Sequence, residues 1–302
     1  MTIAATIKKT VKSRFPAPAA RMVKRLGIWP SYWVQMRKCR ESWRLYGDQY
    51  DQNILFVAGL PKSGTTWLER MIASYPGFEI QARIPEAEFH ELHTGGSHDF
   101  ELPEGVFERF DRRLAVMKLH SHGSEHNNRV LAASGVRCVY LYRDLRDIAV
   151  SNYFYVRRAR WHPEYRLYKN ADLNEGLRIF ADRRLGEYVD WIRSWKTNAA
   201  PETTLEVRYE QILEEPIEIM TKVAALFGLD TDADRIAEIV ERNSFKRMTG
   251  GRKPGQENSK SFVRKGKAGD WKNQFDEETK AIFKASIGDF LIETGYENDD
   301  TW

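Results

Sequence analysis

Short apolar runs alternate with longer segments of helical periodicity along most of this chain. Four runs predict β-strands, at residues 54–58, 114–118, 136–142 and 204–209, and the first of them is expected to be buried. Helices are predicted where apolar positions recur every three to four residues: from Thr65 onward, from Asp144 to about Tyr155, and over residues 174–199, 217–227, 232–243 and 277–294. Strands that alternate with helices predict a parallel sheet covered on both faces. The expected fold class is therefore α/β: a single three-layer domain whose central parallel sheet is flanked by helices.

Two other segments stand out in this pattern. The helix predicted over residues 174–199 carries Tyr188, Trp191 and Trp195 at helical spacing, and we expect these rings to pack in the core. Residues 246–270, in contrast, have several glycines among lysines, arginines and serines. This composition predicts a long, mobile, basic loop.

The composition is that of a globular protein with a full core. Hydrophobic residues make up 42% and charged residues 30% of 302 residues. The longest apolar runs are too short to cross a bilayer, and the first 25 residues lack the apolar stretch of a secretory leader. Cys39 and Cys138 are the two cysteines, which excludes a disulfide framework and a cysteine-based zinc site. We therefore expect a cytoplasmic protein.

Positive charge is concentrated at the N-terminus. Residues 1–40 hold ten lysines or arginines and no acidic residue, whereas the whole chain has a net charge of only +4. We predict that residues 1–50 form a basic, irregular N-terminal extension and that residues 51–302 form the domain. Basic residues next to Trp29 and Trp33 suit peripheral membrane contact through residues 1–45, or a partner, and a disordered solubilising tail suits the same composition. Because the charge does not extend over the whole chain, no nucleic-acid partner is predicted.

A glycine-containing loop joins the first predicted strand to the first predicted helix. Residues 59–66 read GLPKSGTT, and such a loop can wrap an anion with backbone amides at a helix N-terminus. The two glycines have the spacing of the nucleotide-triphosphate P-loop, but Thr65 stands where that motif has lysine, and Lys62 lies inside the loop. Taken alone, the segment is either an anion cradle or a glycine turn with a solvated lysine.

Three segments in order resemble the cytosolic-type sulfotransferases that use 3′-phosphoadenosine-5′-phosphosulfate (PAPS). Residues 61–67 (PKSGTTW) match the family's 5′-phosphosulfate loop, and residues 140–151 match its 3′-phosphate motif, an arginine followed eight residues later by a serine. Residues 264–272 (RKGKAGDWK) match the family's RKGxxGDWK segment at every fixed position. The resemblance implies a fold like that of the P-loop-containing nucleotide hydrolases and transfer of a sulfuryl group from PAPS to a hydroxyl or, less readily, an amine.

The resemblance also implies roles for individual residues. Lys62 would stabilise the leaving phosphate, which suits a reaction in which fixed positive groups supply most of the catalysis. A guanidinium fork suits a phosphate, as implied for Arg143. The full set implied to bind the nucleotide is Lys62, Ser63, Gly64, Thr65 and Thr66 at the 5′-phosphate, Trp67, Tyr209, Asn243 and Phe245 at the adenine, and Arg143, Ser151, Arg264, Lys265 and Gly266 at the 3′-phosphate.

The catalytic base follows from the same comparison. Residues 116–120 (VMKLH) resemble the family's lysine-x-histidine element after a strand. His120 would take the proton from the acceptor hydroxyl, since imidazole titrates in a suitable range. Lys118 would steady the transferring group. We expect no metal ion, because the histidines between residues 90 and 126 include no HExxH element.

Several questions stay open at the level of sequence. A P-loop-type phosphotransferase or kinase and a catalytically silent nucleotide-binding protein are the alternative functions. The acceptor, a small molecule, lipid or sugar with a hydroxyl, is expected to meet residues 84–98, 153–173 and 248–261, and His90 and His93 either line its side of the site or lie on a surface loop. The dimerisation element of many family members lacks its Thr-Val pair here, which leaves the oligomeric state undetermined.

Overall fold

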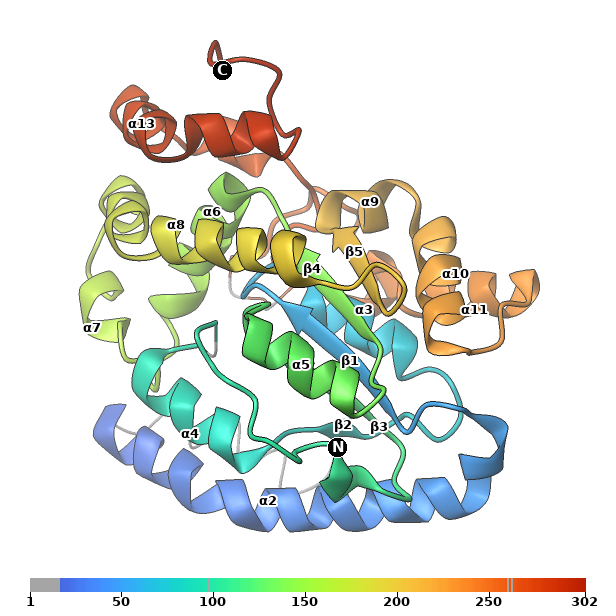
Figure 1. The fold of residues 1–302 in the computed structure, drawn as a ribbon. Coiled ribbons are helices and arrows are strands. Elements are labelled where there is room, and N and C mark those ends of the chain that lie inside the picture. The colour runs from blue at the N-terminus through green and yellow to red at the C-terminus, as the bar shows by residue number, and fades with distance from the viewer. Residues whose placement is uncertain (1–16, 97, 260, 262) are drawn as a thin grey trace.

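Five parallel strands form the central sheet of the protein, which we describe from a computed structural model that covers residues 17–302 except 97, 260 and 262 (Figure 1). The strands are β1 (Ile54–Gly59), β2 (Gln81–Ala82), β3 (Ala115–Leu119), β4 (Cys138–Tyr142) and β5 (Thr204–Arg208), in the spatial order β2-β3-β1-β4-β5. All four neighbouring pairs are parallel. The four strands expected from sequence are confirmed, and β2 is an addition at the edge.

The side chains of β1 alternate between two apolar cores. Leu55 and Val57 point to one face of the sheet, and Phe56 and Ala58 point to the other. Leu68, Met71 and Ile72 of α3 pack on the first face, together with residues of α10 and α11. The helices concerned are α3 (Thr65–Ile72), α9 (Tyr209–Glu214), α10 (Pro216–Phe227) and α11 (Ala233–Arg242). The predicted three-layer arrangement is thus present.

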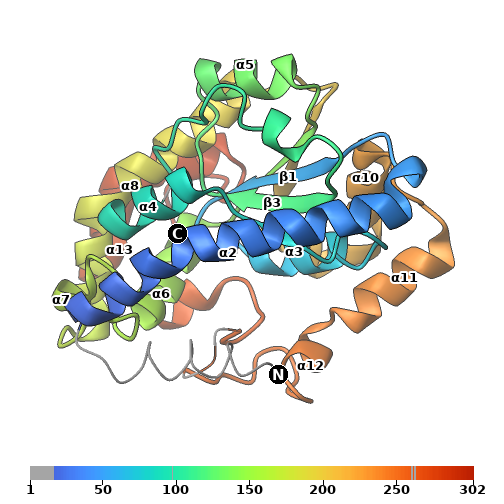
Figure 2. The same cartoon turned by 90° about the horizontal axis from the view of Figure 1, so that it is seen from below.

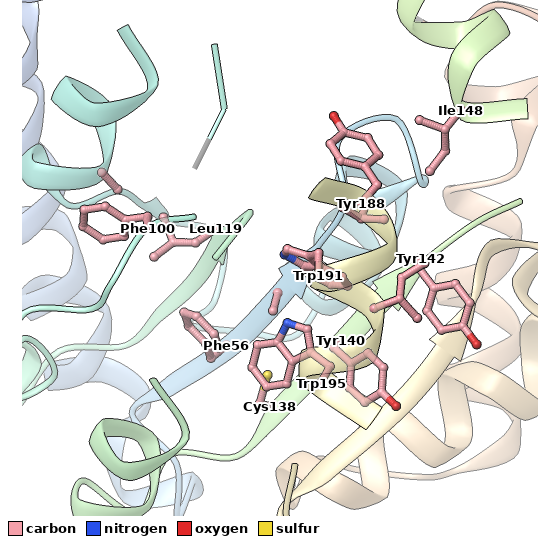
Figure 3. Close-up of a cluster of buried hydrophobic side chains, with 14 of the residues drawn as sticks. Phe56, Phe100, Leu119, Cys138, Tyr140, Tyr142, Ile148, Tyr188, Trp191 and Trp195 are labelled. Carbon is pink, nitrogen blue, oxygen red and sulfur yellow. The ribbon is translucent and has the colours of Figure 1, made fainter. Parts of the chain in front are cut away.

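The second face is covered chiefly by the long helix α8 (Leu173–Asn198) and by helices that pack beside it. The ring of Trp195 stacks on Tyr140 of β4 with a centroid separation of 5.5 Å (Figure 3). Trp191 and Tyr188 are also buried, so the packing role expected for these aromatic residues is confirmed. The other elements on this side are α4 (Pro85–Thr94), α5 (Glu125–Ala133), α6 (Leu145–Val156) and α13 (Glu277–Glu293).

Short helical turns and one long loop complete the described chain. The turns are η1 (Gly47–Gln49), η2 (Glu108–Phe110), α7 (Tyr165–Tyr168), α12 (Phe245–Met248) and η3 (Asp270–Asn273). Between α12 and η3 the described residues form no helix or strand, which agrees with the loop predicted over residues 246–270. That prediction was wrong only at its start, where Ser244 caps α12 by accepting a hydrogen bond from the amide of Arg247.

Residues 1–50 were expected to be irregular, and this prediction is wrong for residues 17–46. They form the helix α2 (Ala17–Tyr46), which is 30 residues long. Ile28, Tyr32, Met36 and Cys39 lie on one side of α2 and are buried. The backbone carbonyl of Cys39 also accepts a hydrogen bond from the amide of Leu114, just before β3. A helix forms here because these four positions make one apolar stripe that the sheet edge and α4 can cover. Residues 1–16 lie outside the described chain.

None of the helices that the structure describes is long and apolar enough to cross a membrane.

The sheet topology brings predicted site residues from four segments to one edge. Loop residues follow directly from the carboxyl ends of β1, β3, β4 and β5, which are neighbours in the sheet. His120 follows β3, Arg143 follows β4, and Tyr209 follows β5. Open α/β sheets bind ligands beyond the carboxyl ends of their strands, so this edge is the place to look for a site.

Candidate functional site

The loop from β1 to α3 has the backbone geometry of an anion cradle. Gly64 caps the N-terminus of α3 with φ of 84°, and a Cβ there would lie 2.5 Å from the ring of Tyr209. Lys62 has φ of 71°, which is uncommon for a residue with a side chain. The loop therefore turns tightly into α3 and directs the first amides of that helix outward, where an anion is favoured.

Positive side chains converge on this loop. Burial lowers the pKa of Lys62 to about 7, and the positive charges of Arg143, Lys118 and Arg264 lower that pKa further. These four cations come from four separate segments: the loop after β1, strand β3, the end of β4 and the C-terminal loop. Like charges placed together in the free protein disfavour one another, so the arrangement is one that a bound anion would stabilise.

Two buried polar atoms of the predicted site make no hydrogen bond within the described chain. Within the described chain, Ser63 Oγ and Arg143 Nε are buried without a hydrogen bond. Buried polar atoms are normally satisfied, and each exception calls for an explanation. A nucleotide carrying phosphates fits both atoms, since each can donate a hydrogen bond to a phosphate oxygen.

Arg143 is held in place by α6 and by the C-terminal loop. Its Nη2 donates to Asp147 Oδ2 at 2.7 Å and to the backbone carbonyl of Lys267 at 3.0 Å. The guanidinium carbon lies 4.4 Å from the centre of the Tyr209 ring. Ser151 lies half-buried further along α6. Arg143 is thus held between the carboxylate of Asp147 and the ring of Tyr209.

Asp147 also anchors the segment that carries the RKGxxGDWK pattern. Its carboxylate accepts hydrogen bonds from the amides of Gly269, at 2.8 Å, and Trp271, at 3.0 Å. Within the same segment, Asp270 accepts hydrogen bonds from the side chains of Arg264 and Lys265. Because a carboxylate already pairs with both cations, an incoming phosphate would compete with Asp270 for them.

Gly266 fits closely against the start of α12. It has φ of 62°, and a Cβ at this position would lie 2.1 Å from the ring of Phe245. Any other residue would therefore push the segment away from α12. This contact brings two of the residues implied by the resemblance together.

The remaining residues implied at the adenine also meet. Trp67 Nε1 donates to the backbone carbonyl of Asn243 at 2.8 Å, and the Trp67 ring lies edge-on to Tyr209 with a centroid separation of 6.3 Å. The Asn243 side chain donates to Ser74 Oγ and to the carbonyl of Ile239. These contacts give Asn243 a structural role in joining α11 to α3. Stacking of Trp67 on adenine stays a prediction.

His120 lies at the end of β3, behind the loop. Its Nδ1 is hydrogen-bonded to the backbone carbonyl of Gly59, and its own carbonyl accepts a hydrogen bond from Trp191 Nε1 at 2.7 Å. Burial lowers the pKa of His120 to about 4, although the negative charge of Glu91 opposes the shift. The imidazole is therefore neutral near pH 7, with its proton on Nδ1 and its lone pair on Nε2.

Lys118 is buried beside two side chains of α3. Its Nζ lies 3.7 Å from Glu69 Oε2 and 3.5 Å from Thr66 Oγ1. Burial lowers the pKa of Lys118, and the negative charge of Glu69 opposes that shift. Glu69, Glu91 and Asp147 are the acidic residues that sequence reasoning missed, since an isolated carboxylate in a helical pattern gives no signal that distinguishes it from a solvated one.

A small cavity of about 30 Å³ lies next to Pro61 and Lys62. Gly95, Gly96 and His98 line it from one predicted acceptor segment, and Tyr155, His162 and Glu164 line it from the next. Asn152, Arg184 and Tyr188 complete its polar wall. The described residues of 248–261, the third expected segment, do not line this cavity. His90 and His93 lie on α4, and no group of three metal-binding side chains was found among the described residues.

Arg184 holds this wall together. Its Nη2 lies 2.8 Å from Glu164 Oε1 and its Nη1 lies 2.7 Å from Glu187 Oε2, which also pairs with His98. Burial lowers the pKa of His162 to about 4. Among the described residues His98 Nδ1 has no hydrogen-bond partner. The cavity is therefore a preorganised polar space with at least one unused hydrogen-bonding atom.

Comparison with known proteins agrees with this geometry. Residues 52–295 match the family model described as the sulfotransferase domain. A protein of Flaveria bidentis named flavonol sulfotransferase-like is 28% identical over 262 residues, which cover 80% of this chain and 82% of that protein. Sulfotransferase 1A1 of Rattus norvegicus is 26% identical over 264 residues, covering 80% of this chain and 86% of the relative.

A solved structure shares the fold. The crystal structure of mouse sulfotransferase SULT7A1 complexed with PAP superposes with a TM-score of 0.57 at 21% identity, and the match covers 86% of this chain and 95% of that one.

Proposed function

We propose that this chain, which belongs to the sulfotransferase family, transfers the sulfuryl group of PAPS to a hydroxyl group of a small-molecule acceptor. The observation that carries the proposal is the convergence of Lys62, Lys118 and two arginines on the loop after β1, with His120 beside it. A silent binding protein would need the cations but not the neutral, buried imidazole. The family match does not favour the phosphotransferase alternative.

The reaction exchanges one sulfur–oxygen bond for another. The bond from sulfur to the bridging phosphate oxygen of PAPS breaks, a bond from sulfur to the acceptor oxygen forms, and the acceptor proton is left to be removed. Negative charge grows on the leaving phosphate as this happens, so fixed cations at that position lower the barrier. We expect the transfer to need no metal ion.

His120 would take the acceptor proton on Nε2. The hydrogen bond from Nδ1 to the Gly59 carbonyl fixes the tautomer and the ring orientation. Because its pKa is lowered to about 4, His120 is unprotonated over the whole neutral range and is ready to accept.

Lys62 would neutralise the leaving phosphate. Its pKa of about 7 in the free protein means that only part of the population carries the charge at neutral pH. A bound phosphate would raise that pKa by supplying the opposite charge, so binding itself would complete the charged form. Ser63 Oγ and the amides of Gly64 to Thr66 would complete the cradle.

The acceptor would bind next to Lys62, on the side of the polar cavity. The two predicted acceptor segments that line it come together there with Tyr155 and Tyr188. Buried polar groups discriminate strongly between ligands that satisfy them and ligands that do not. We therefore expect the acceptor to carry a further hydrogen-bonding group near its reacting hydroxyl.

Isothermal titration with adenosine 3′,5′-bisphosphate, in parallel with ATP and without magnesium, tests the nucleotide site. Tight binding of the bisphosphate, lost in Arg143→Ala and kept in the exposed control Arg242→Ala, would support the proposal. Preference for ATP, or binding of neither nucleotide, would overturn it. Bisphosphate binding would justify a turnover screen with PAPS against phenols, alcohols, amines, lipids and sugars.

A further inference from the structure

Helix α2 has a second apolar face that no described residue covers. Met22, Leu26, Trp29 and Trp33 recur at intervals of four, three and four residues and so share one side of the helix. Their exposed fractions are 58%, 69%, 47% and 64%. Ile28 and Tyr32, each one residue before a tryptophan and so about a quarter turn around the helix, are on the side packed against the protein. An exposed cluster with two tryptophans marks an interaction surface rather than ordinary surface variation.

This outer apolar face is continued by positive charge. Arg37, Arg40 and Arg44 extend the same line of the helix by four, three and four residues, and all three are exposed. Arg37 lies 3.5 Å from Glu41, the acidic residue of this helix, so the stripe keeps a net positive charge. The outer face is therefore apolar and aromatic in its first half and basic in its second.

The position of α2 leaves this face accessible. The helix runs along the outside of the molecule, at the bottom in Figure 1 and toward the viewer in Figure 2. A groove of about 460 Å³ opens beside it, between Pro30 and Val34 of α2 and Ile80 next to the edge strand β2. Lys38 lies at the same groove. The groove thus adds apolar and cationic groups beside the outer face.

We propose that the outer face of α2 binds the surface of an anionic lipid bilayer. Tryptophan rings favour the boundary between headgroups and acyl chains, and leucine and methionine add buried apolar area just below it. Three arginines in line add attraction to anionic headgroups. A second copy of the chain would be a poorer occupant, because parallel pairing along this face of α2 brings two basic stripes together and antiparallel pairing places arginines against the apolar half.

The attachment of α2 to the rest of the protein makes this surface relevant to the site. Arg21 donates to the backbone carbonyls of Trp161 and His162 at 3.2 and 3.3 Å, and Lys24 Nζ lies 4.0 Å from the centre of the Trp161 ring. His162 lines the polar cavity next to Lys62. A protein lying on a bilayer through α2 would therefore hold one wall of this cavity close to the lipid surface.

Co-sedimentation of the full chain with vesicles tests the proposal. Vesicles of phosphatidylcholine alone are compared with vesicles that also contain phosphatidylglycerol. We expect binding to the anionic vesicles, a loss of about tenfold or more in the partition coefficient for Trp29→Ala/Trp33→Ala, and a similar loss for Arg37→Gln/Arg40→Gln/Arg44→Gln. Ile217→Ala/Arg242→Gln, which removes an exposed apolar and an exposed basic residue on α10 and α11, is the matched control.

Circular dichroism of every variant verifies that it is folded. Each outcome of the sedimentation experiment then supports or overturns membrane binding by α2. Equal partitioning of wild type and both α2 variants, or no binding to anionic vesicles, would overturn the proposal. A dimer in size-exclusion chromatography that Trp29→Ala/Trp33→Ala converts to a monomer would also overturn it, because a second copy would then be the occupant. None of these measurements depends on sulfuryl transfer, so they stand apart from the proposed function.

Discussion

At the scale of single residues, Lys62 links the charge of the site to pH. Its pKa lies near 7 because burial and the neighbouring Arg143, Lys118 and Arg264 all disfavour the charged form. Above this pH the Lys62 amine is mostly neutral in the free protein. The protein must therefore take up a proton on Lys62 when it binds an anion there. We predict that the affinity for adenosine 3′,5′-bisphosphate falls by up to about tenfold per pH unit between about pH 7 and 9.

Calorimetry in two buffers of different ionisation enthalpy measures this directly. Proton uptake on binding should grow above pH 7 and should vanish in Lys62→Met. In that range the arginines stay charged and His120 stays neutral. The difference between the wild type and Lys62→Met then separates Lys62 from Lys118, whose pKa burial also lowers. An unchanged slope in Lys62→Met would assign the proton to another group.

His120 allows a second prediction in which binding and chemistry separate. The variant His120→Asn keeps an N–H that can donate to the Gly59 carbonyl but has no nitrogen that can accept a proton. We expect kcat with PAPS and a competent acceptor to fall by about 10²–10⁴-fold while bisphosphate affinity stays within about twofold. His126→Ala, a histidine on α5 away from the loop, is the control. Wild-type kcat in His120→Asn would remove this residue from the role of base.

At the scale of elements, the sequence was informative wherever one local rule decided the outcome. Strands β1, β3 and β4 were predictable as short apolar runs bounded by turns, and β5 as a β-branched run with alternating polarity. The two-residue strand β2 was not, since its pairing with β3 depends on tertiary contact alone. Helix α2 was missed because Pro30 and the exposed tryptophans obscure the stripe that ends at Cys39.

The site divides in the same way. The residues of three ordered segments could be named from sequence, and the structure brings Lys62, Arg143 and Arg264 together. The tether from Asp147 could not be predicted, because the amides of Gly269 and Trp271 that it binds lie 122 and 124 positions away in the sequence. Long-range pairing of this kind follows from the fold alone.

Asp147 provides a prediction at this scale, because it joins α6 to the C-terminal loop. Removing its carboxylate in Asp147→Ala leaves the amides of Gly269 and Trp271 and the guanidinium of Arg143 without their acceptor. We expect the free energy of unfolding to fall by about 3–5 kcal/mol and bisphosphate binding to weaken. Asp147→Asn, which keeps one acceptor oxygen, should lose less of both.

Urea unfolding and titration calorimetry measure the two effects. Asp182→Ala, an exposed carboxylate on α8, is the matched control and should change neither. Full nucleotide affinity in a folded Asp147→Ala protein would mean that the C-terminal loop does not depend on this tether.

At the scale of the whole molecule, the question is whether α2 unfolds together with the rest of the domain. Met36 is 7% exposed and belongs to the same apolar core as Phe56 of β1, whereas Trp33, three residues earlier, is 64% exposed. If α2 is part of the cooperative unit, Met36→Ala should lower the free energy of unfolding by about 2–5 kcal/mol, because it removes buried apolar volume. Trp33→Ala should change it by no more than about 0.5 kcal/mol. Urea unfolding of both variants measures the difference, and a wild-type midpoint for Met36→Ala would restore residues 1–50 as an extension outside the domain.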